Sequence, residues 1–112
     1  MSIKADIENI LIQLKYPVND ATKKQLENIA NNTDGFFEFA KHIFTLSDEL
    51  KAVNALVAMS NSKDYIKLKC NSTNPSEIEK FEEIIKSWAN KYKLNLQKVE
   101  NKNTYYIIGK SS

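Results

Sequence analysis

The chain has 112 residues, of which 42% are hydrophobic and 27% are charged, with only 2 glycines and 2 prolines. This length and composition predict one globular domain with its own core, and they argue against a disordered or fibrous chain. A single cysteine and a single histidine exclude an intramolecular disulfide and a zinc site built from cysteines and histidines. We therefore expect no metal and no organic cofactor.

The charge of the chain comes from lysine alone, because all 16 basic residues are lysines against 14 acidic residues. Residues 1–60 hold 6 lysines against 8 acidic residues, whereas residues 61–112 hold 10 against 6. Arginine, whose planar fork reads phosphates and guanine bases, is absent, which disfavours specific recognition of nucleic acid. No stretch predicts a membrane span or a signal peptide, so we expect a cytoplasmic protein.

Apolar residues at helical spacing predict two helices at the start of the chain. The first spans residues 2–15 and ends at Tyr16-Pro17, because proline disfavours a helical conformation in the residue before it. The second begins at Asn19 or Asp20, whose side chains can cap it, and ends in a polar run that closes with Gly35.

Two further helices are predicted before residue 60. Residues 36–44 fit a helix better than a strand, since several aromatic and aliphatic side chains then share one face. Thr45 or Ser47 is expected to cap the next helix, which closes at residues 61–64. Its buried side would carry Leu50, Val53, Leu56 and Val57.

The rest of the chain predicts a β-α-β-β unit. Tyr65–Cys70 alternates apolar and polar side chains, as a strand does. Asn74 as N-cap and Pro75 at the first helical position open an amphipathic helix that ends near Lys93. Strands over 94–100 and 104–109 then form a hairpin, joined by a turn rich in asparagine.

The expected fold class is therefore α+β, with N-terminal helices followed by a β-α-β-β unit that forms a small sheet packed on helices. We expect a single domain over residues 1–112, made of a helical segment over 1–44 and an α/β unit over 45–112. Phe81 and Trp88 are expected to anchor the core between the long helix and the sheet.

Three features of the C-terminal half carry a family resemblance. A helix like Leu50–Met59 precedes the strand Tyr65–Cys70, a helix ending in Trp88-Ala89-Asn90-Lys91-Tyr92 runs into a strand, and a hairpin closes the chain. Over about residues 46–110 this layout resembles the TusA/SirA family of small sulfur-carrier proteins. The resemblance implies that Phe36–Ile43 would have to supply the family's first strand.

The chemistry of that family depends on a Cys-Pro-x-Pro motif whose thiol accepts sulfur as a persulfide. The corresponding segment, Thr45-Leu46-Ser47-Asp48, contains neither cysteine nor proline. The resemblance therefore implies the scaffold without the carrier reaction.

Two groups of residues are candidate binding sites. Tyr65, Lys67 and Lys69 share one face of their strand, and Tyr105 or Tyr106 should join them from the last strand; we assign Tyr105 to this set. Aromatic and basic groups on a sheet can hold a partner, including RNA. The loop Asn71-Ser72-Thr73-Asn74 precedes a helix and could hold an anion through its backbone N–H groups, although capping explains the same residues.

Neither of the two most reactive side chain types predicts catalysis. Cys70 precedes a helix N-terminus, where a thiolate is favoured, but it shares its strand face with Ile66 and Leu68 and is expected to be buried. His42 has no second ligand at metal-binding spacing. A half-buried helical histidine is favoured there over a pH-sensitive contact.

The sequence therefore favours a non-catalytic interaction module that binds another protein or a second copy of itself. One alternative is a degenerate sulfur-relay partner, which follows from the family resemblance. The other is a weak RNA-binding or DNA-binding module that uses the lysine-rich C-terminal half.

Overall fold

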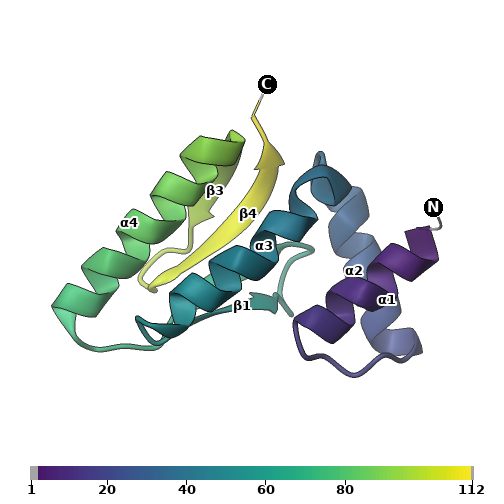
Figure 1. Cartoon of the computed structure of the whole chain (residues 1–112), viewed down its shortest axis with the longest axis horizontal. Helices are drawn as coiled ribbons and strands as arrows, with labels where there is room; N and C mark the ends of the chain where they lie inside the picture. Colours follow the sequence, from purple (N-terminus) through teal and green to yellow (C-terminus); the bar gives the residue numbers. More distant parts are fainter. Residues whose placement is uncertain (1–2, 112) are drawn as a thin grey trace.

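The structure is a computed structural model that describes residues 3–111. Within them, three helices, two strands, one helix and two strands follow in chain order (Figure 1). They are α1 (Ile3–Gln13), α2 (Asp20–Asn32), α3 (Phe36–Lys51), β1 (Ala55–Met59), β2 (Ile66–Cys70), α4 (Pro75–Tyr92), β3 (Leu94–Lys98) and β4 (Thr104–Lys110). The predicted α+β fold class is confirmed.

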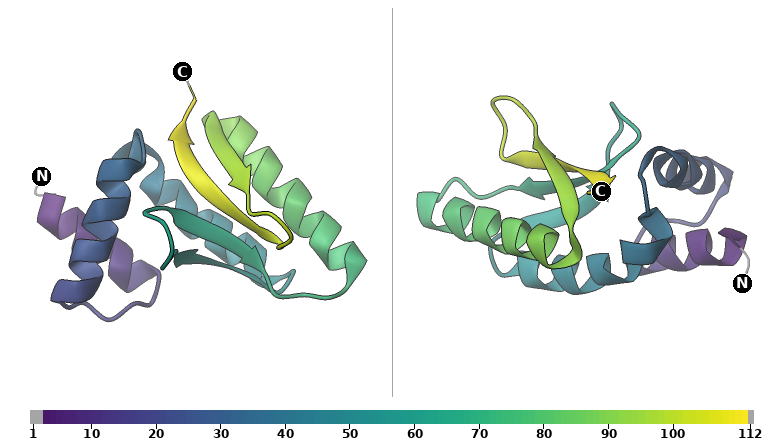
Figure 2. Two further views of the ribbon diagram at one scale, coloured as in Figure 1. Left: turned by 180° about the vertical axis from the view of Figure 1, so that it is seen from behind. Right: turned by 90° about the horizontal axis from the view of Figure 1, so that it is seen from above.

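The strands form one antiparallel sheet in the order β1-β2-β4-β3. Helix α4 connects β2 to β3, and β4 lies between these two strands, so β2-α4-β3 is a split β-α-β unit. Helices α3 and α4 lie on the same face of the sheet, and α1 and α2 lie beside its β1 end (Figure 2). None of the helices within residues 3–111 lies on the opposite face.

Residues 36–44 are helical, as predicted, but residues 45–60 differ from the sequence prediction. Helix α3 runs without a break through Thr45 and Ser47, so neither residue caps a new helix, and the boundary expected at residue 44 lies inside α3. The chain leaves the helical conformation near Asn54, whose φ is +57°. The helix predicted to carry Leu50, Val53, Leu56 and Val57 is therefore wrong, because its second half is strand β1.

Pairing with β2 explains why this short apolar run is a strand. Val57 lies opposite Leu68 and Met59 opposite Ile66, and all four side chains are buried, while Leu56, which precedes Val57, is exposed. A run of five residues with apolar groups at several positions fits both a helical and an alternating pattern. The hydrogen-bonded pairing of β1 with β2 selects the strand conformation.

The same segment bears on two of the elements used in the family resemblance. Leu50–Met59 is the end of α3 followed by β1, not a helix, and Phe36–Ile43 is helical, not a strand. The resemblance itself stays a prediction.

The elements predicted after residue 65 are confirmed in their order. Asn74 is the N-cap of α4, accepting a hydrogen bond from the Ser76 N–H at 2.9 Å, and Pro75 begins the helix. β3 and β4 pair antiparallel, and Asn101 in their turn has a φ of +62°. At the start of the chain, Asn19 caps α2.

The core lies between α3, α4 and the face of the sheet that they cover. The largest buried side chains of α4 include Phe81, Ile85 and Trp88. The outer edge of β1 meets the N-terminal helices: the Met59 N–H donates to the Tyr16 hydroxyl at 2.9 Å. The Gln25 amide donates to the Ser60 carbonyl at 3.2 Å.

The far end of β4 is tied to the turn between α2 and α3. The Lys110 N–H donates to the Asp34 carbonyl at 3.0 Å, and the Lys110 ammonium pairs with Glu38. Gly109 has a φ of +141°, and a Cβ there would lie 2.8 Å from the Asp34 nitrogen. Glycine alone tolerates this φ and has no Cβ to clash with Asp34, so Gly109 allows the two backbones to come this close.

Trp88→Ala is expected to lower the free energy of unfolding by about 3–5 kcal/mol. The indole N–H donates to the His42 carbonyl at 3.1 Å, and the ring packs edge-on against Phe39, so the substitution opens a cavity and removes this hydrogen bond between α4 and α3. Urea denaturation measures the loss, with the exposed Lys86→Ala on the same helix as a control. A loss below about 1 kcal/mol would contradict a core position for Trp88.

Candidate functional site

Strand alternation divides the sheet into a covered face and an open face. On the covered face Ile66 lies opposite Ile107 and Leu68 opposite Tyr105. On the open face Lys67 lies opposite Tyr106 and Lys69 opposite Thr104. The side chains available to a partner on the sheet are therefore those of the second set.

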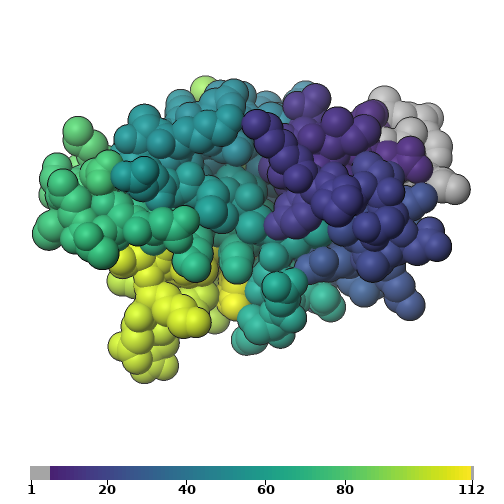
Figure 3. All heavy atoms as spheres, turned by 90° about the horizontal axis from the view of Figure 1, so that it is seen from below, coloured from purple at the N-terminus to yellow at the C-terminus, as the bar shows by residue number. Residues whose placement is uncertain are grey.

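Two loops rise from the open face, residues 60–65 between β1 and β2 and residues 99–103 between β3 and β4. They stand at opposite ends of the strands and project away from α3 and α4 (Figure 2). The notch between them is visible in Figure 3. It is a cavity of about 190 Å³, called the sheet cleft below, lined by Ser60, Asn61, Ser62, Lys67, Lys69, Val99, Lys102, Thr104 and Tyr106.

The floor of the sheet cleft carries a chain of hydroxyl groups. The Tyr106 hydroxyl lies 3.2 Å from Ser62 Oγ, which lies 3.3 Å from Ser60 Oγ. Ser60 Oγ also accepts hydrogen bonds from the backbone N–H groups of Ser62 and Lys63, at 3.3 and 3.4 Å. Ser60 is 5% exposed and Tyr106 is 9% exposed. Burial and these hydrogen bonds fix the positions of the Ser60 and Tyr106 hydroxyls.

The lysines of the sheet cleft have no acidic partner in the described part of the chain. The ion pairs there join Lys23 to Glu8, Lys51 to Asp48, Lys98 to Glu82 and Lys110 to Glu38. None of them includes Lys67, Lys69 or Lys102, and none of the residues that line the cleft is acidic. The charged residues that line the cleft are therefore all positive, which attracts anionic groups.

The structure brings together only part of the predicted binding set. Tyr65 lies beside the sheet cleft, with its ring centroid 5.6 Å from that of Tyr106, and Lys67 and Lys69 line the cleft. Tyr105 lies on the covered face, where its hydroxyl donates to Glu82 at 2.6 Å. Of the two tyrosines left open by the sequence, Tyr106 therefore joins the lysines.

Sequence reasoning missed the loop residues Ser60, Ser62 and Lys102. The first two lie in a polar run that was assigned to the end of a helix, so nothing indicated that they fold back over a strand. Lys102 is far from Lys67 in sequence, and the pairing of β4 with β2 brings the loop that holds Lys102 beside the strand that holds Lys67. The sequence signal that pointed toward Lys102 was the lysine and asparagine content of the turn between β3 and β4.

The two neighbouring tyrosines have opposite electrostatic environments. Hydrogen bonding by Ser62, then by Ser60, together with the charges of Lys63 and Lys102, lowers the pKa of Tyr106 against the opposing effect of burial. Burial, then the hydrogen bond and negative charge of Glu82, raises the pKa of Tyr105 to about 12.

An alkaline absorbance titration is expected to separate the two phenols. Tyr106→Phe should remove a phenol whose pKa lies below the ordinary tyrosine value of 10.0. Tyr105→Phe should remove a phenol whose pKa is about 12. Ser62→Ala should raise the pKa of Tyr106, because the phenolate loses a donor. If Tyr106→Phe instead removed the ionisation near pH 12, the placement of Tyr106 on the open face and Tyr105 on the covered face would be contradicted.

Polar groups of the loop Asn71-Ser72-Thr73-Asn74 make hydrogen bonds to other groups of the chain. The Ser72 hydroxyl donates to Glu77 at 2.7 Å, and the Asn54 amide donates to the same carboxylate at 3.2 Å. The Asn74 N–H donates to Ser72 Oγ at 3.0 Å. The Glu77 carboxylate thus accepts hydrogen bonds from two side chains at this loop, and the anion site expected at its backbone N–H groups stays a prediction.

Cys70 is buried at 6% exposure, and its thiol donates to the Val53 carbonyl at 3.6 Å. It lies on the covered face of the sheet, away from the lysines. His42 is partly buried, and its ring stacks on Tyr92 with the centroids 3.9 Å apart. Burial, then the charges of Lys41 and Lys91, lowers the pKa of His42 from its usual 6.5.

His42 is expected to make stability depend on pH. Because its pKa is lowered in the folded state, the unfolded chain binds more protons below pH 6.5. The contribution of neutral His42 to the free energy of unfolding is therefore full above pH 6.5. It declines as the pH falls from 6.5 through the lowered pKa of His42. Urea unfolding at several pH values should show this decline, and His42→Gln should reduce it. An unchanged slope in His42→Gln would contradict the assignment.

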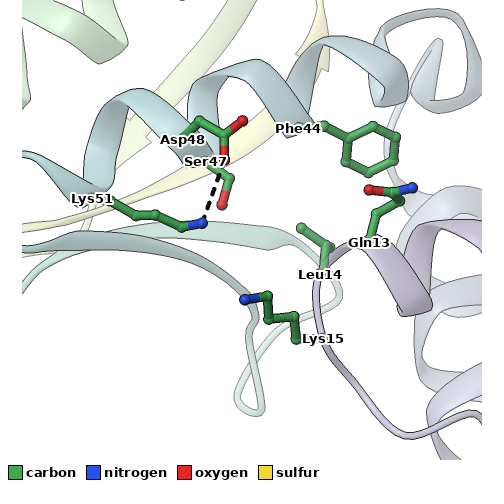
Figure 4. Close-up of a pocket in the computed structure, with 7 residues that line it drawn as sticks. All are labelled: Gln13, Leu14, Lys15, Phe44, Ser47, Asp48 and Lys51. Atoms are coloured by element: carbon green, nitrogen blue, oxygen red, sulfur yellow. Dashed lines mark hydrogen bonds and ion pairs between the residues drawn. The ribbon is translucent and has the colours of Figure 1, made fainter.

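A second hollow lies between the end of α1 and α3, where the side chains are labelled in Figure 4. Its volume is about 110 Å³, and its lining includes Leu14, Phe44, Asp48 and Lys51. Here Lys51 pairs with Asp48 at 3.4 Å, so the charges compensate each other. This hollow therefore differs from the sheet cleft in having a carboxylate, that of Asp48, in its lining.

Other classes of site find no support in residues 3–111. No group of three or more histidine, cysteine, aspartate or glutamate side chains among them is placed to hold a metal ion. No helix among them is long and apolar enough to cross a membrane. No protein-family model, no curated protein and no solved structure matches the chain.

Proposed function

We propose that this protein is a non-catalytic cytoplasmic interaction module that docks an acidic segment of a partner protein in the sheet cleft. The observation that carries the proposal is the set of lysines in the cleft, Lys67, Lys69 and Lys102, without an acidic partner in the described part of the chain. A carboxylate-bearing segment would compensate this charge and hydrogen-bond to the hydroxyls of the floor.

Apolar side chains next to the lysines favour a protein over a nucleic acid. Leu56 is 36% exposed and lies opposite Lys69, and Ala58 lies opposite Lys67. Ile108 follows Tyr106 on the same face of β4 and is partly exposed. A protein segment that alternates acidic and apolar side chains matches this surface, whereas bases would need free aromatic faces for stacking.

Charge reversal by Lys67→Glu together with Lys69→Glu is expected to abolish partner binding while leaving the fold intact, because both side chains lie on the open face. The tagged protein is used to capture partners from an extract of its native cell, before and after nuclease treatment. The matched control is Lys80→Glu with Lys86→Glu on the exposed side of α4.

A protein retained by the wild type and the control, and lost from the cleft variant, would support the proposal. Equal capture by all three would contradict it. Binding that disappears after nuclease treatment would favour the RNA-binding or DNA-binding alternative. Loss of self-association in the cleft variant, measured by sedimentation, would identify a second copy of the chain as the occupant instead.

Cys70 is expected to be dispensable for binding. In the native state its thiol should react with a labelling reagent far more slowly than after unfolding, because it is buried on the covered face. Cys70→Ser should reduce stability by placing a hydroxyl in the core, yet keep the partner. Rapid native labelling, or a persulfide on Cys70 with loss of activity in a folded Cys70→Ser, would favour the sulfur-relay alternative.

A further inference from the structure

We infer that the sheet cleft contains a subsite for a phosphate group, so that the segment docked there is a phosphorylated protein segment. This inference rests on the proposed function and narrows the chemistry of the partner. It is carried by the three lysines and the hydrogen-bonded hydroxyls that line one small cavity.

The charge of the cavity fits a phosphate ester better than a carboxylate. Lys67, Lys69 and Lys102 line it, and no acidic side chain does. A phosphorylated side chain carries a charge of about −1.5 to −2 near neutral pH and three strong acceptor oxygens, whereas a carboxylate carries one charge and two oxygens. The three lysine charges of this lining are therefore better compensated by a phosphate than by a single carboxylate.

The floor of the cavity supplies donors that are already positioned. Ser62 Oγ lies between the Tyr106 hydroxyl and Ser60 Oγ, at 3.2 and 3.3 Å. Because hydroxyl hydrogens rotate, Ser62 and Tyr106 can turn a donor toward an oxyanion in the cavity. The positive charges of Lys63 and Lys102 also reach this floor, since both act on the Tyr106 phenol.

The size of the cavity is consistent with one such group. Its volume is about 190 Å³, well above the roughly 10–15 Å³ that a cavity needs on this measure to hold one water molecule. The loops 60–65 and 99–103 stand at its two ends, so a ligand enters from the open face and meets lysines from both a strand and a loop. A partner chain would cross the sheet between the loops and insert its phosphorylated side chain.

The test uses the purified full chain and three peptides of one apolar-acidic sequence with serine, glutamate or phosphoserine at the central position. Amide shifts in two-dimensional NMR spectra give the affinity and the site. We expect the phosphoserine peptide to bind at least about tenfold more tightly than the glutamate peptide, with the largest shifts at Ser62, Lys67 and Lys102. Free inorganic phosphate should compete for the same residues.

Variants separate the phosphate subsite from nonspecific charge. Lys67→Gln with Lys69→Gln should remove the preference for phosphoserine, and Ser62→Ala should weaken it while the lysines remain. The matched control, Lys80→Gln with Lys86→Gln, should keep the preference in full. Retention of native amide shifts elsewhere shows that each variant is folded.

Equal affinity for the phosphoserine and glutamate peptides, or shifts outside the cleft, would overturn the inference. A short oligothymidylate that binds more tightly than the phosphoserine peptide through the same lysines would overturn it in favour of nucleic acid. If the phosphate preference is absent while capture from the cell extract still depends on Lys67 and Lys69, the phosphate subsite is wrong and the docking surface stands.

Discussion

Strand β4 lies inside the sheet, hydrogen-bonded to β2 along one edge and to β3 along the other, and its register fixes which side chains face the helices. A slip of one residue would exchange the two faces of a strand. The contact of Gly109 and Lys110 with Asp34 holds the end of β4 against the turn between α2 and α3. That contact tolerates only glycine at position 109, so it opposes a slip.

This register gives two adjacent tyrosines different roles. Tyr105 enters the covered face and bonds to Glu82 of α4, which ties the helix to the sheet. Tyr106 enters the open face, where Ser62 from the β1–β2 loop closes over its hydroxyl. The same alternation therefore builds the core on one side and the floor of the sheet cleft on the other. The proposed docking function and phosphate subsite depend on this division.

Much of the fold follows from local patterns, because the alternation of 65–70, the cap at Asn74 and the amphipathic α4 are each encoded in adjacent residues. β1 was missed because its apolar run fits a helix equally well until it pairs with β2. The candidate site was predictable only in Lys67 and Lys69. Its other members come from loops that the tertiary fold brings over the sheet, and the choice of Tyr106 depends on which face α4 covers.

The register of β4 is tested most directly by the nuclear Overhauser contacts made by the two tyrosine rings in the free protein. We expect Tyr106 to show contacts to Ser62 and to the side chain of Lys67, and Tyr105 to show contacts to Phe81. Contacts of Tyr105 to Lys67 or Ser62, with Tyr106 against Phe81, would contradict the register of β4 and with it the sheet cleft.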